Sequence, residues 1–438
     1  MRLDMDTTET LVVGAGPTGL GAAWACERQA RPYRLVDAGA RAGGLATTVD
    51  LDGYRWDLGG HVIHSHFADF DAAVEQSGVR MADVARTGSV LLDDGGFVPT
   101  PVQQQLDEIP SDIRPGAPSA NLAEHFRHEM GQELYDSFFR PLSVKTWAHP
   151  PEDMDHAWTS LRSGSVRTNV PRVGLRSPGG PTEHFPYPEK GSGSLWDGVA
   201  AGLDPTAQRY GTRLVDLDLE GHVARFDDAT QVRYERLVST APLDQLCAMA
   251  GDEACRRLGS ELVHTQVSLL GFGVRGPVPE ALQDKTYIYC ASPEVVWLRA
   301  TVLSNYSPAM APEGCWNILF EISAPLAAAG AGTDGLAERC LESLVALGVD
   351  TDRVERRWSR SLAYGYPVPT LGRDDALRTI LATFEAKDVS SRGRFGGWRY
   401  ESCNQDYSFA QGVEAVTSGT DAVLWRPGDF SVEKGPPG

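Results

Sequence analysis

The sequence predicts an α/β protein with three parts: a Rossmann-type domain, a small helical domain and an antiparallel β-sheet domain. Three observations lead to this prediction. An apolar run near the N-terminus ends in a glycine-rich turn, the middle of the chain has apolar residues at helical spacing, and the second half has strand-like runs at hairpin spacing. At 438 residues the chain has room for two or three domains of about 150 residues each.

The glycine-rich turn is the strongest local signal. Residues 11–13 are apolar, and Gly14, Gly16 and Gly19 follow as Gly-x-Gly-x-x-Gly before an alanine-rich segment. In a dinucleotide site the first glycine makes the turn, the second lets a pyrophosphate approach the backbone, and the third packs helix against strand. A second strand over residues 33–36 ends at Asp37, where a ribose hydroxyl needs an acceptor. The spacing therefore predicts a dinucleotide site and leaves FAD and NAD both open.

Further along the chain, paired glycines at Gly43-Gly44 and Gly59-Gly60 suggest backbone that lies against a flat ligand. We expect a discontinuous cofactor-binding domain formed by residues 1–66, 188–258 and 386–438. Apolar spacing between residues 121 and 139 predicts that residues 67–150 form the helical domain. Residues 151–187 and 259–385 are expected to form the antiparallel sheet domain, with strands near 265–274, 286–290, 295–303, 315–322 and 354–362.

The charge of the chain limits its partners. Acidic residues number 59 and basic residues 40, so the formal net charge is −19. Nucleic acids and anionic membranes bind through basic patches, so neither is an expected partner. The seven scattered cysteines give no disulfide framework, and the N-terminus has no apolar signal core. We therefore expect a cytoplasmic protein.

Several longer motifs make a family resemblance specific. Beyond the glycine turn, they lie at residues 43–46, 57–63, 147–148, 299–301, 304–308, 365–371, 391–401 and 404–406. On these motifs the chain resembles UDP-galactopyranose mutases of the eukaryotic type along nearly its whole length. The resemblance implies an isomerase that interconverts the pyranose and furanose forms of a nucleotide-diphosphate sugar. It also implies that reduced FAD acts as the nucleophile without net redox change, and that NADH or NADPH is the reductant.

The resemblance also implies roles for individual residues. Four residues match catalytic positions: His61, Arg162, Arg299 and Arg394. Eight match substrate-binding positions: Gln103, Thr100, Val102, Trp147, Tyr289, Tyr366, Tyr400 and Asn404. The expected cofactor-binding residues are Gly14, Gly16, Gly19, Asp37, Gly43, Gly44, Leu45, Gly60, His61, Arg394 and Gln405. The arginines would hold the diphosphate, since a guanidinium offers paired donors to a phosphate.

One departure from the family concerns the nucleotide base. The uracil-binding stretch of the family carries two aromatic residues, and this chain has Thr100 and Val102 in their place, followed by Gln103. A base stacked on an aromatic ring gains about 1–3 kcal/mol, so the loss is not neutral. Either the base differs, with guanine as the candidate in a GDP-hexose, or another ring such as Phe97 stacks on uracil.

A second departure is His64, which stands where the family has an aromatic residue. It places His61, His64 and His66 within six residues of one another, and imidazoles bind divalent transition metals. The spacing matches no usual zinc signature, so no metal site is assigned. Two alternatives to the flavin mutase stay open: a flavin-dependent oxidoreductase related to amine oxidases or desaturases, and a metal-assisted mutase without flavin chemistry.

Overall fold

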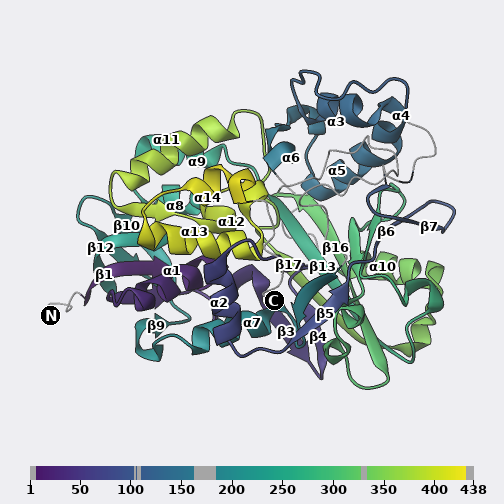
Figure 1. Ribbon diagram of the computed structural model, residues 1–438, viewed down its shortest axis with the longest axis horizontal. Coiled ribbons are helices and arrows are strands. Elements are labelled where there is room, and N and C mark those ends of the chain that lie inside the picture. Colours follow the sequence, from purple (N-terminus) through teal and green to yellow (C-terminus); the bar gives the residue numbers. More distant parts are fainter. Residues whose placement is uncertain (1–5, 103–104, 106–109, 162–183, 327–332, 431–438) are drawn as a thin grey trace.

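Two seven-stranded sheets, one in each half of the molecule, form the framework of the protein (Figure 1). The structure is a computed structural model, and it describes residues 6–102, 105, 110–161, 184–326 and 333–430. The mixture of parallel and antiparallel sheets with covering helices confirms the α/β class. Within the described part of the chain, no helix is both long and apolar enough to cross a bilayer.

The first sheet has the strand order β10-β11-β12-β1-β2-β9, and β18 pairs with β12. The strand β1 (Asp6–Val13) pairs in parallel with both β2 (Tyr33–Val36) and β12 (Gln231–Ser239). Helix α1 (Pro17–Arg28) connects β1 to β2, and α13 (Gln405–Thr417) packs against α1. Leu11 and Val12 are fully buried, which explains the continuous apolar run in β1. The other strands are β9 (Gln208–Arg209), β10 (Leu214–Asp218), β11 (Val223–Phe226) and β18 (Val389–Ser391).

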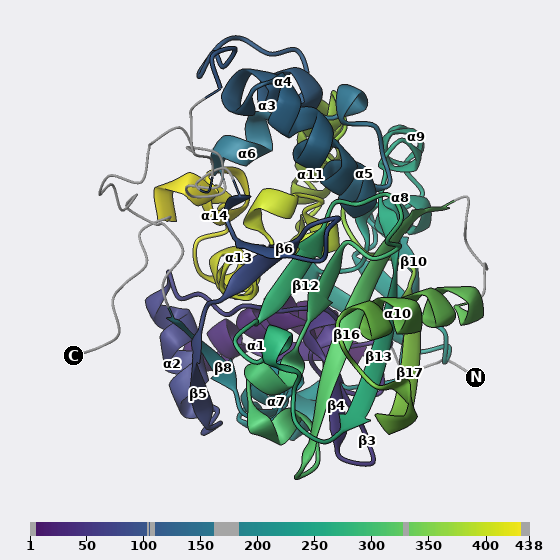
Figure 2. The same cartoon turned by 90° about the vertical axis from the view of Figure 1, so that its right-hand side faces the viewer.

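The second sheet has the order β17-β13-β16-β15-β14-β6-β7 and is antiparallel except where β6 pairs with β14. Its long central strands are β13 (Thr265–Arg275) and β16 (Cys315–Pro325), with β17 (Val354–Leu362) at the edge. The shorter strands are β6 (Gly88–Leu91), β7 (Phe97–Pro99), β14 (Tyr287–Cys290) and β15 (Arg299–Thr301). Figure 2 shows α10 (Asp334–Ala346) lying across this sheet.

The segment expected to be a helical domain is only partly helical. Its helices are α2 (Ala68–Gln76), α3 (Leu122–Met130), α4 (Gln132–Leu134) and α5 (Arg140–Trp147), and α6 (Ala157–Leu161) follows. Its strands β6 and β7 belong to the second sheet, and β5 (Met81–Ala85) pairs with β8 (His184–Pro188). The helical prediction did not include the hairpin of β6 and β7, whose turn contains Gly95 at a positive φ of 83°.

A small hairpin joins the two halves of the molecule. Its strands β3 (Thr48–Leu51) and β4 (Tyr54–Asp57) lie against the second sheet, where Trp56 stacks on Trp358 at 5.6 Å. Gly271 of β13 makes this approach close, since a Cβ there would lie 2.3 Å from the Trp56 Nε1. The chain that leaves β4 therefore runs between the two sheets. The remaining helices are α7 (Ser192–Ala201), α8 (Leu243–Met249), α9 (Glu253–Ser260), α11 (Arg373–Glu385), α12 (Gly393–Gly396) and α14 (Ala422–Trp425).

Candidate functional site

The glycine turn between β1 and α1 has the geometry of a phosphate-binding loop. Gly14 adopts a φ of 100°, and a Cβ there would lie 1.9 Å from the Thr240 Oγ1. A Cβ on Gly19 would lie 1.7 Å from the Gly14 carbonyl oxygen, so helix and strand pack without room for a side chain. The N-cap of α1 is Gly16, so no side chain caps the first amides of this helix, and its first turn has no acidic residue. An anion is therefore the natural partner of this helix terminus.

Asp37 and the glycine pair at residues 43–44 complete the turn. The Asp37 carboxylate accepts hydrogen bonds from the Ala15 and Gly39 amides, both at 2.5 Å. Burial raises its pKa, and the two amides and Arg213 oppose that rise. A Cβ on Gly44 would lie 3.2 Å from the Gly16 Cα, so two stretches of bare backbone face each other. Leu45 follows and packs against the apolar core of the first sheet.

The N-terminus of α13 contributes an unsatisfied amide. Gln405 accepts hydrogen bonds from the Trp196 Nε1 at 2.6 Å and the Ser192 Oγ at 3.1 Å. Its Nε2 is buried and makes no hydrogen bond, and an unsatisfied buried donor is costly. The bare glycine backbone, the free terminus of α1 and this donor fit a bound dinucleotide. The expected cofactor residues thus lie in a setting suited to such a ligand.

The second sheet brings three side chains together across neighbouring strands. Tyr289 of β14 pairs in register with Arg299 of β15, and Arg299 pairs with Glu321 of β16. The Arg299 Nε and Nη2 donate to the two Glu321 carboxylate oxygens at 2.6 and 2.8 Å. Burial of Glu321 opposes ionisation, but Arg299 and the Gly60 amide hold the pKa of this carboxyl below its ordinary value. Arg299 also hydrogen-bonds the Tyr289 side chain, and a guanidinium has five N–H groups, so it can still donate to a further acceptor.

The loop after β4 lies against this row of side chains. The Gly60 amide donates to the Glu321 Oε1 at 3.0 Å, and a Cβ on Gly60 would lie 2.5 Å from the Thr301 Oγ1. The next residue, His61, has a side chain that is 25% exposed. Burial lowers its pKa to about 4; Glu321 opposes this shift, and Arg299 and Arg394 reinforce it. His61 is therefore a neutral imidazole at neutral pH.

Aromatic rings form the wall opposite this loop. Trp147 lies edge-on to Tyr400 at 4.9 Å and to Tyr366 at 5.9 Å between ring centroids. The Arg394 guanidinium lies 5.0 Å from the centre of the Tyr366 ring and donates to the Gly365 carbonyl oxygen at 2.9 Å. Burial raises the pKa of Tyr366, so its hydroxyl is protonated at neutral pH. Six sequence-predicted residues thus share one site with His61: Trp147, Tyr289, Arg299, Tyr366, Arg394 and Tyr400.

The other predicted residues are placed as follows. Asn404 is the N-cap of α13, directly before Gln405. Thr100 lies beside the second sheet, with its Oγ1 3.5 Å from the Tyr287 hydroxyl, and Val102 follows two residues later. Tyr287 in turn contacts Tyr289 edge-on at 5.7 Å, which connects Thr100 to the site. Arg162 and Gln103 lie outside the described residues.

The three histidines after β4 do not converge on one point. The His66 Nδ1 lies 2.5 Å from the Asp406 Oδ2, and its ring packs against Tyr407. The ring centroids of His64 and His66 are 6.1 Å apart. Within the ranges that the structure describes, no group of three or more His, Cys, Asp or Glu side chains could hold a metal ion.

Glu321, the partner of Arg299, was not among the residues predicted from the sequence. A signal was present, since Glu321 is the only charged residue in the apolar segment 315–322, and such a charge is seldom buried without a function. Its partner could not be inferred, because the register of three strands decides which side chains meet.

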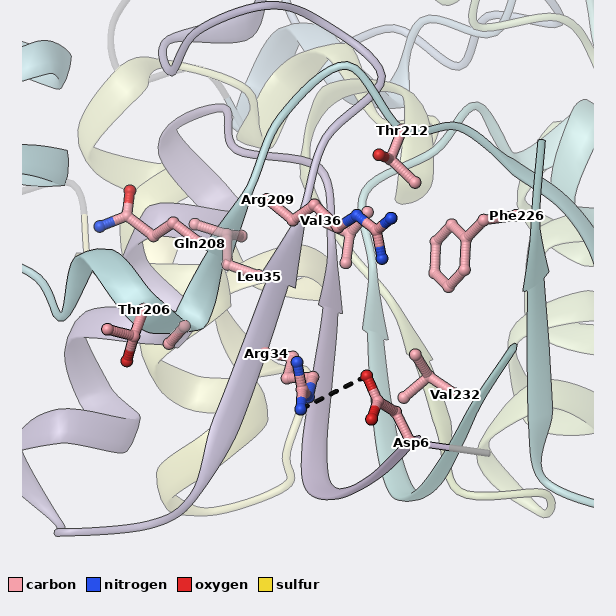
Figure 3. Close-up of a pocket in the computed structure, with 11 residues that line it drawn as sticks. Asp6, Arg34, Leu35, Val36, Thr206, Gln208, Arg209, Thr212, Phe226 and Val232 are labelled. Carbon is pink, nitrogen blue, oxygen red and sulfur yellow. Dashed lines mark ion pairs between the residues drawn. The ribbon is translucent and has the colours of Figure 1, made fainter. Parts of the chain in front are cut away.

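A small cavity of about 30 Å³ lies elsewhere, on the first sheet (Figure 3). Its lining combines apolar side chains such as Val36 and Phe226 with Arg34, which pairs with Asp6 at 3.4 Å. A second arginine of the lining, Arg209, pairs with Asp228. Both guanidinium charges are therefore compensated, and none of the predicted site residues lines this cavity.

Comparisons with known proteins support this fold assignment. A family model described as an NAD(P)-binding Rossmann-like domain matches residues 12–74. A crystal structure of reduced UDP-galactopyranose mutase is similar with a TM-score of 0.89 and 29% identity, over 98% of each chain. A putrescine oxidase bound to putrescine has a TM-score of 0.67 at 14% identity, over 94% of this chain and 98% of the other. A fatty acid isomerase from P. acnes has a TM-score of 0.66 at 14% identity, with the same coverage. The likenesses to the oxidase and to the fatty acid isomerase show the fold alone. The likeness to reduced UDP-galactopyranose mutase, at 29% identity, supports the mutase family.

Proposed function

We propose that the protein is a nucleotide-diphosphate-sugar pyranose–furanose mutase of the eukaryotic UDP-galactopyranose mutase type. The observation that carries the proposal is the meeting of His61, Arg299, Arg394 and three aromatic rings beside a dinucleotide-type glycine turn. The similarity to reduced UDP-galactopyranose mutase over 98% of both chains supports it. A true oxidoreductase shares this framework, as the 14% identical putrescine oxidase illustrates, but the fold alone does not specify a reaction.

FAD is the proposed cofactor, with NADH or NADPH as its reductant. When bound and reduced, it supplies a nucleophilic nitrogen for attack on the anomeric carbon of the sugar. Gly14, Gly16 and Gly19 would receive the pyrophosphate at the N-terminus of α1, and Asp37 would accept from a ribose hydroxyl. Gly44 and the Gln405 Nε2 would contact other parts of the same ligand.

The chain's own residues would bind the sugar nucleotide and orient it. Glu321 takes the Nε and one Nη2 donor of Arg299, which fixes the guanidinium plane and leaves further N–H groups for the departing diphosphate. Arg162 would approach the same group from a second side. Tyr289, Tyr366, Tyr400 and Asn404 would donate to phosphate or sugar oxygens, and Trp147 would exclude water.

The decisive experiment is incubation of the dithionite-reduced, FAD-loaded protein with a panel of UDP- and GDP-hexopyranoses, followed by NMR of the products. We expect a furanose product at equilibrium with its pyranose, and no net consumption of O2. The oxidised protein serves as a control, and a parallel reaction with EDTA tests the metal-assisted alternative. Stoichiometric O2 consumption without a furanose product would identify an oxidoreductase instead.

A further inference from the structure

The turn that carries His61 also carries a buried carboxylate at its start. Asp57 is the last residue of β4 and is fully buried, and Gly59 and Gly60 bend the chain back so that His61 returns toward it. The His61 Nδ1 lies 4.0 Å from the Asp57 Oδ2. This nitrogen is buried and makes no hydrogen bond, while the ring as a whole keeps a quarter of its surface exposed. One face of the ring is thus open to a ligand, and its inner nitrogen lacks a partner.

Within the residues that the structure describes, the surroundings of Asp57 contain hydrogen-bond donors but no Lys or Arg ion pair. Its carboxylate accepts hydrogen bonds from the Thr48 Oγ1 at 2.5 Å, the Tyr187 hydroxyl at 2.7 Å and the Ser192 amide at 3.1 Å. Among the described residues, the sole ionisable cation within 4 Å of this carboxylate is His61. Burial raises the pKa of Asp57 to about 6, although its hydrogen bonds to Thr48, Tyr187 and Ser192 pull it down.

The charges around His61 keep a second proton off its ring. Glu321 favours the cation, but burial together with Arg299 and Arg394 disfavours it more strongly. A proton that enters this pair near neutral pH therefore resides on Asp57 and not on His61, and the imidazole stays neutral. A neutral imidazole has two tautomers, and the hydrogen bond made by one nitrogen decides which tautomer is present.

We propose that Asp57 is a positioning residue that sets the tautomer of His61, and thereby determines whether the Nε2 accepts or donates a hydrogen bond at the candidate site. In this proposal the imidazole ring turns toward the carboxylate, so that the Nδ1 and the Oδ2 come within hydrogen-bond distance. Ionised Asp57 accepts the Nδ1 proton, which leaves a lone pair on Nε2. Protonated Asp57 donates to Nδ1, which leaves a proton on Nε2.

The change from one tautomer to the other takes up one proton in total. A proton binds at Nε2, and the proton already on Nδ1 passes to the Asp57 Oδ2, so the imidazole is neutral before and after. The relevance of this switch to catalysis depends on the proposed function, because that proposal places His61 beside the cofactor. The switch itself depends only on residues 57 and 61 and on the groups packed around them.

The tautomer can be observed directly in the FAD-loaded protein. Long-range ¹H–¹⁵N spectra distinguish protonated from unprotonated imidazole nitrogens, and His61→Gln identifies the signals of His61. We expect a Nδ1–H tautomer at pH 8 and a change to Nε2–H as the pH falls through about 6. In Asp57→Asn this pH step disappears, since a carboxamide neither binds nor releases a proton in this pH range.

Tyr187→Phe is the second variant, because it leaves the carboxylate in place but removes one donor to it. The midpoint of the step then moves to higher pH. Tyr306→Phe is the matched control: Tyr306 is a buried tyrosine 4.9 Å from the Tyr187 ring, with no hydrogen bond from its hydroxyl to Asp57 among the described contacts, and the midpoint stays in place.

An Asp57→Asn protein with the same step as the wild type would overturn the proposal. If Asp57→Asn fails to fold, an unchanged midpoint in Tyr187→Phe would overturn it equally well. The mutase assay is a separate readout. A tautomer step in a protein without mutase activity would reject the proposed function and support this inference. Mutase activity in a protein without a tautomer step would support the proposed function and reject this inference.

Discussion

The two sheets of this protein build their sites in different ways. In the first sheet the glycine turn is a contiguous stretch, and its backbone supplies the geometry. Side chains are excluded there: a Cβ at Gly14 or Gly19 would collide with neighbouring atoms at less than 2 Å. In the second sheet the site consists of side chains from three strands, and strand pairing brings Tyr289, Arg299 and Glu321 side by side.

This difference determines what each site tolerates. The glycine turn should lose ligand binding when a side chain is added to it. The cross-strand site should lose its function when one member of the Arg299–Glu321 pair is removed. Glu321 is only 2% exposed, so it depends on Arg299 for its charge partner. We therefore expect the largest single effects in the second sheet.

Arg299→Ala is expected to have the largest effect. The substitution removes the proposed diphosphate ligand and leaves the Glu321 carboxylate buried without its cation. We expect kcat/KM to fall by about 30- to 5,000-fold, which corresponds to about 2–5 kcal/mol. Steady-state kinetics of the reduced enzyme measure this loss. Arg299→Lys should recover only part of it, since an ammonium cannot replace the planar fork.

Arg360→Ala provides the matched control. Arg360 is an exposed arginine on the edge strand β17, and it lies in the same cross-strand row through Leu269. Its removal should change stability by less than about 0.5 kcal/mol. Equal activities of Arg299→Ala and Arg360→Ala would show that the positional match of Arg299 to the family is wrong.

The same contrast explains what could be predicted from the sequence. The glycine turn, β2 and Asp37 were predicted because each signal is local, and the Rossmann-type fold is confirmed. Arg299 and Tyr366 were predicted only through family motifs, because no local pattern brings them together. Glu321 was missed because strand register is a non-local property. The hairpin of β6 and β7 was missed because its short strands lie in a segment whose other apolar residues have helical spacing.

The ionisation of Asp57 and His61, in the loop after β4, should affect how the free energy of unfolding depends on pH. The raised pKa of Asp57 adds stability at low pH that is lost as the pH rises toward about 6. The lowered pKa of His61 acts in the opposite sense, with stability lost as the pH falls toward about 4. Each loss reaches about 3 kcal/mol, and because one grows with rising pH and the other with falling pH, their slopes against pH nearly cancel between pH 4 and 6.

Single substitutions should expose each contribution. The free energy of unfolding of Asp57→Asn should rise more steeply with pH than that of the wild type, whereas that of His61→Gln should rise less steeply or fall. Urea unfolding at several pH values between 4 and 7 measures both. Other titrating groups cancel in the difference from wild type. Parallel pH profiles of all three proteins would argue against opposed ionisation of this pair.

The backbone site gives a somewhat smaller effect that depends on ligand concentration. FAD at 100 times its Kd should stabilise the protein by about 2.7 kcal/mol, with a raised Tm and a bound-flavin spectrum. Gly14→Ala should abolish both effects, because of its φ of 100° and the contact with Thr240. Gly419→Ala is the control, since Gly419 also has a positive φ of 66° but no described atom lies within 4 Å of its Cβ position. Loss of FAD binding in both variants would mean that backbone strain in general, and not the glycine turn in particular, prevents binding.

The smallest expected effect concerns the base of the nucleotide. Phe97, the ring that could replace the missing uracil stack, packs against the core beneath α10, and the Lys285 ammonium lies 4.8 Å from its centre. Moving Phe97 toward Thr100 would break its packing against this core and its contact with Lys285. Thr100 and Val102 are smaller than two aromatic side chains, and the Thr100 Oγ1 lies 3.5 Å from the Tyr287 hydroxyl, so a purine would meet less bulk and a polar edge there.

We therefore expect GDP to compete with UDP-galactose at least as well as UDP does, and GDP-hexoses to be accepted as substrates. Specificity would then arise from one reshaped loop, while the sugar-binding residues stay as they are. Thr100→Tyr should restore a stacking ring and shift the preference toward UDP, and Val215→Tyr, at an exposed position on β10, is the control for adding a tyrosine. Competition binding to the reduced protein measures the ratio. A tenfold preference of the wild type for UDP, about 1.4 kcal/mol, would mean that uracil recognition survives without these two rings.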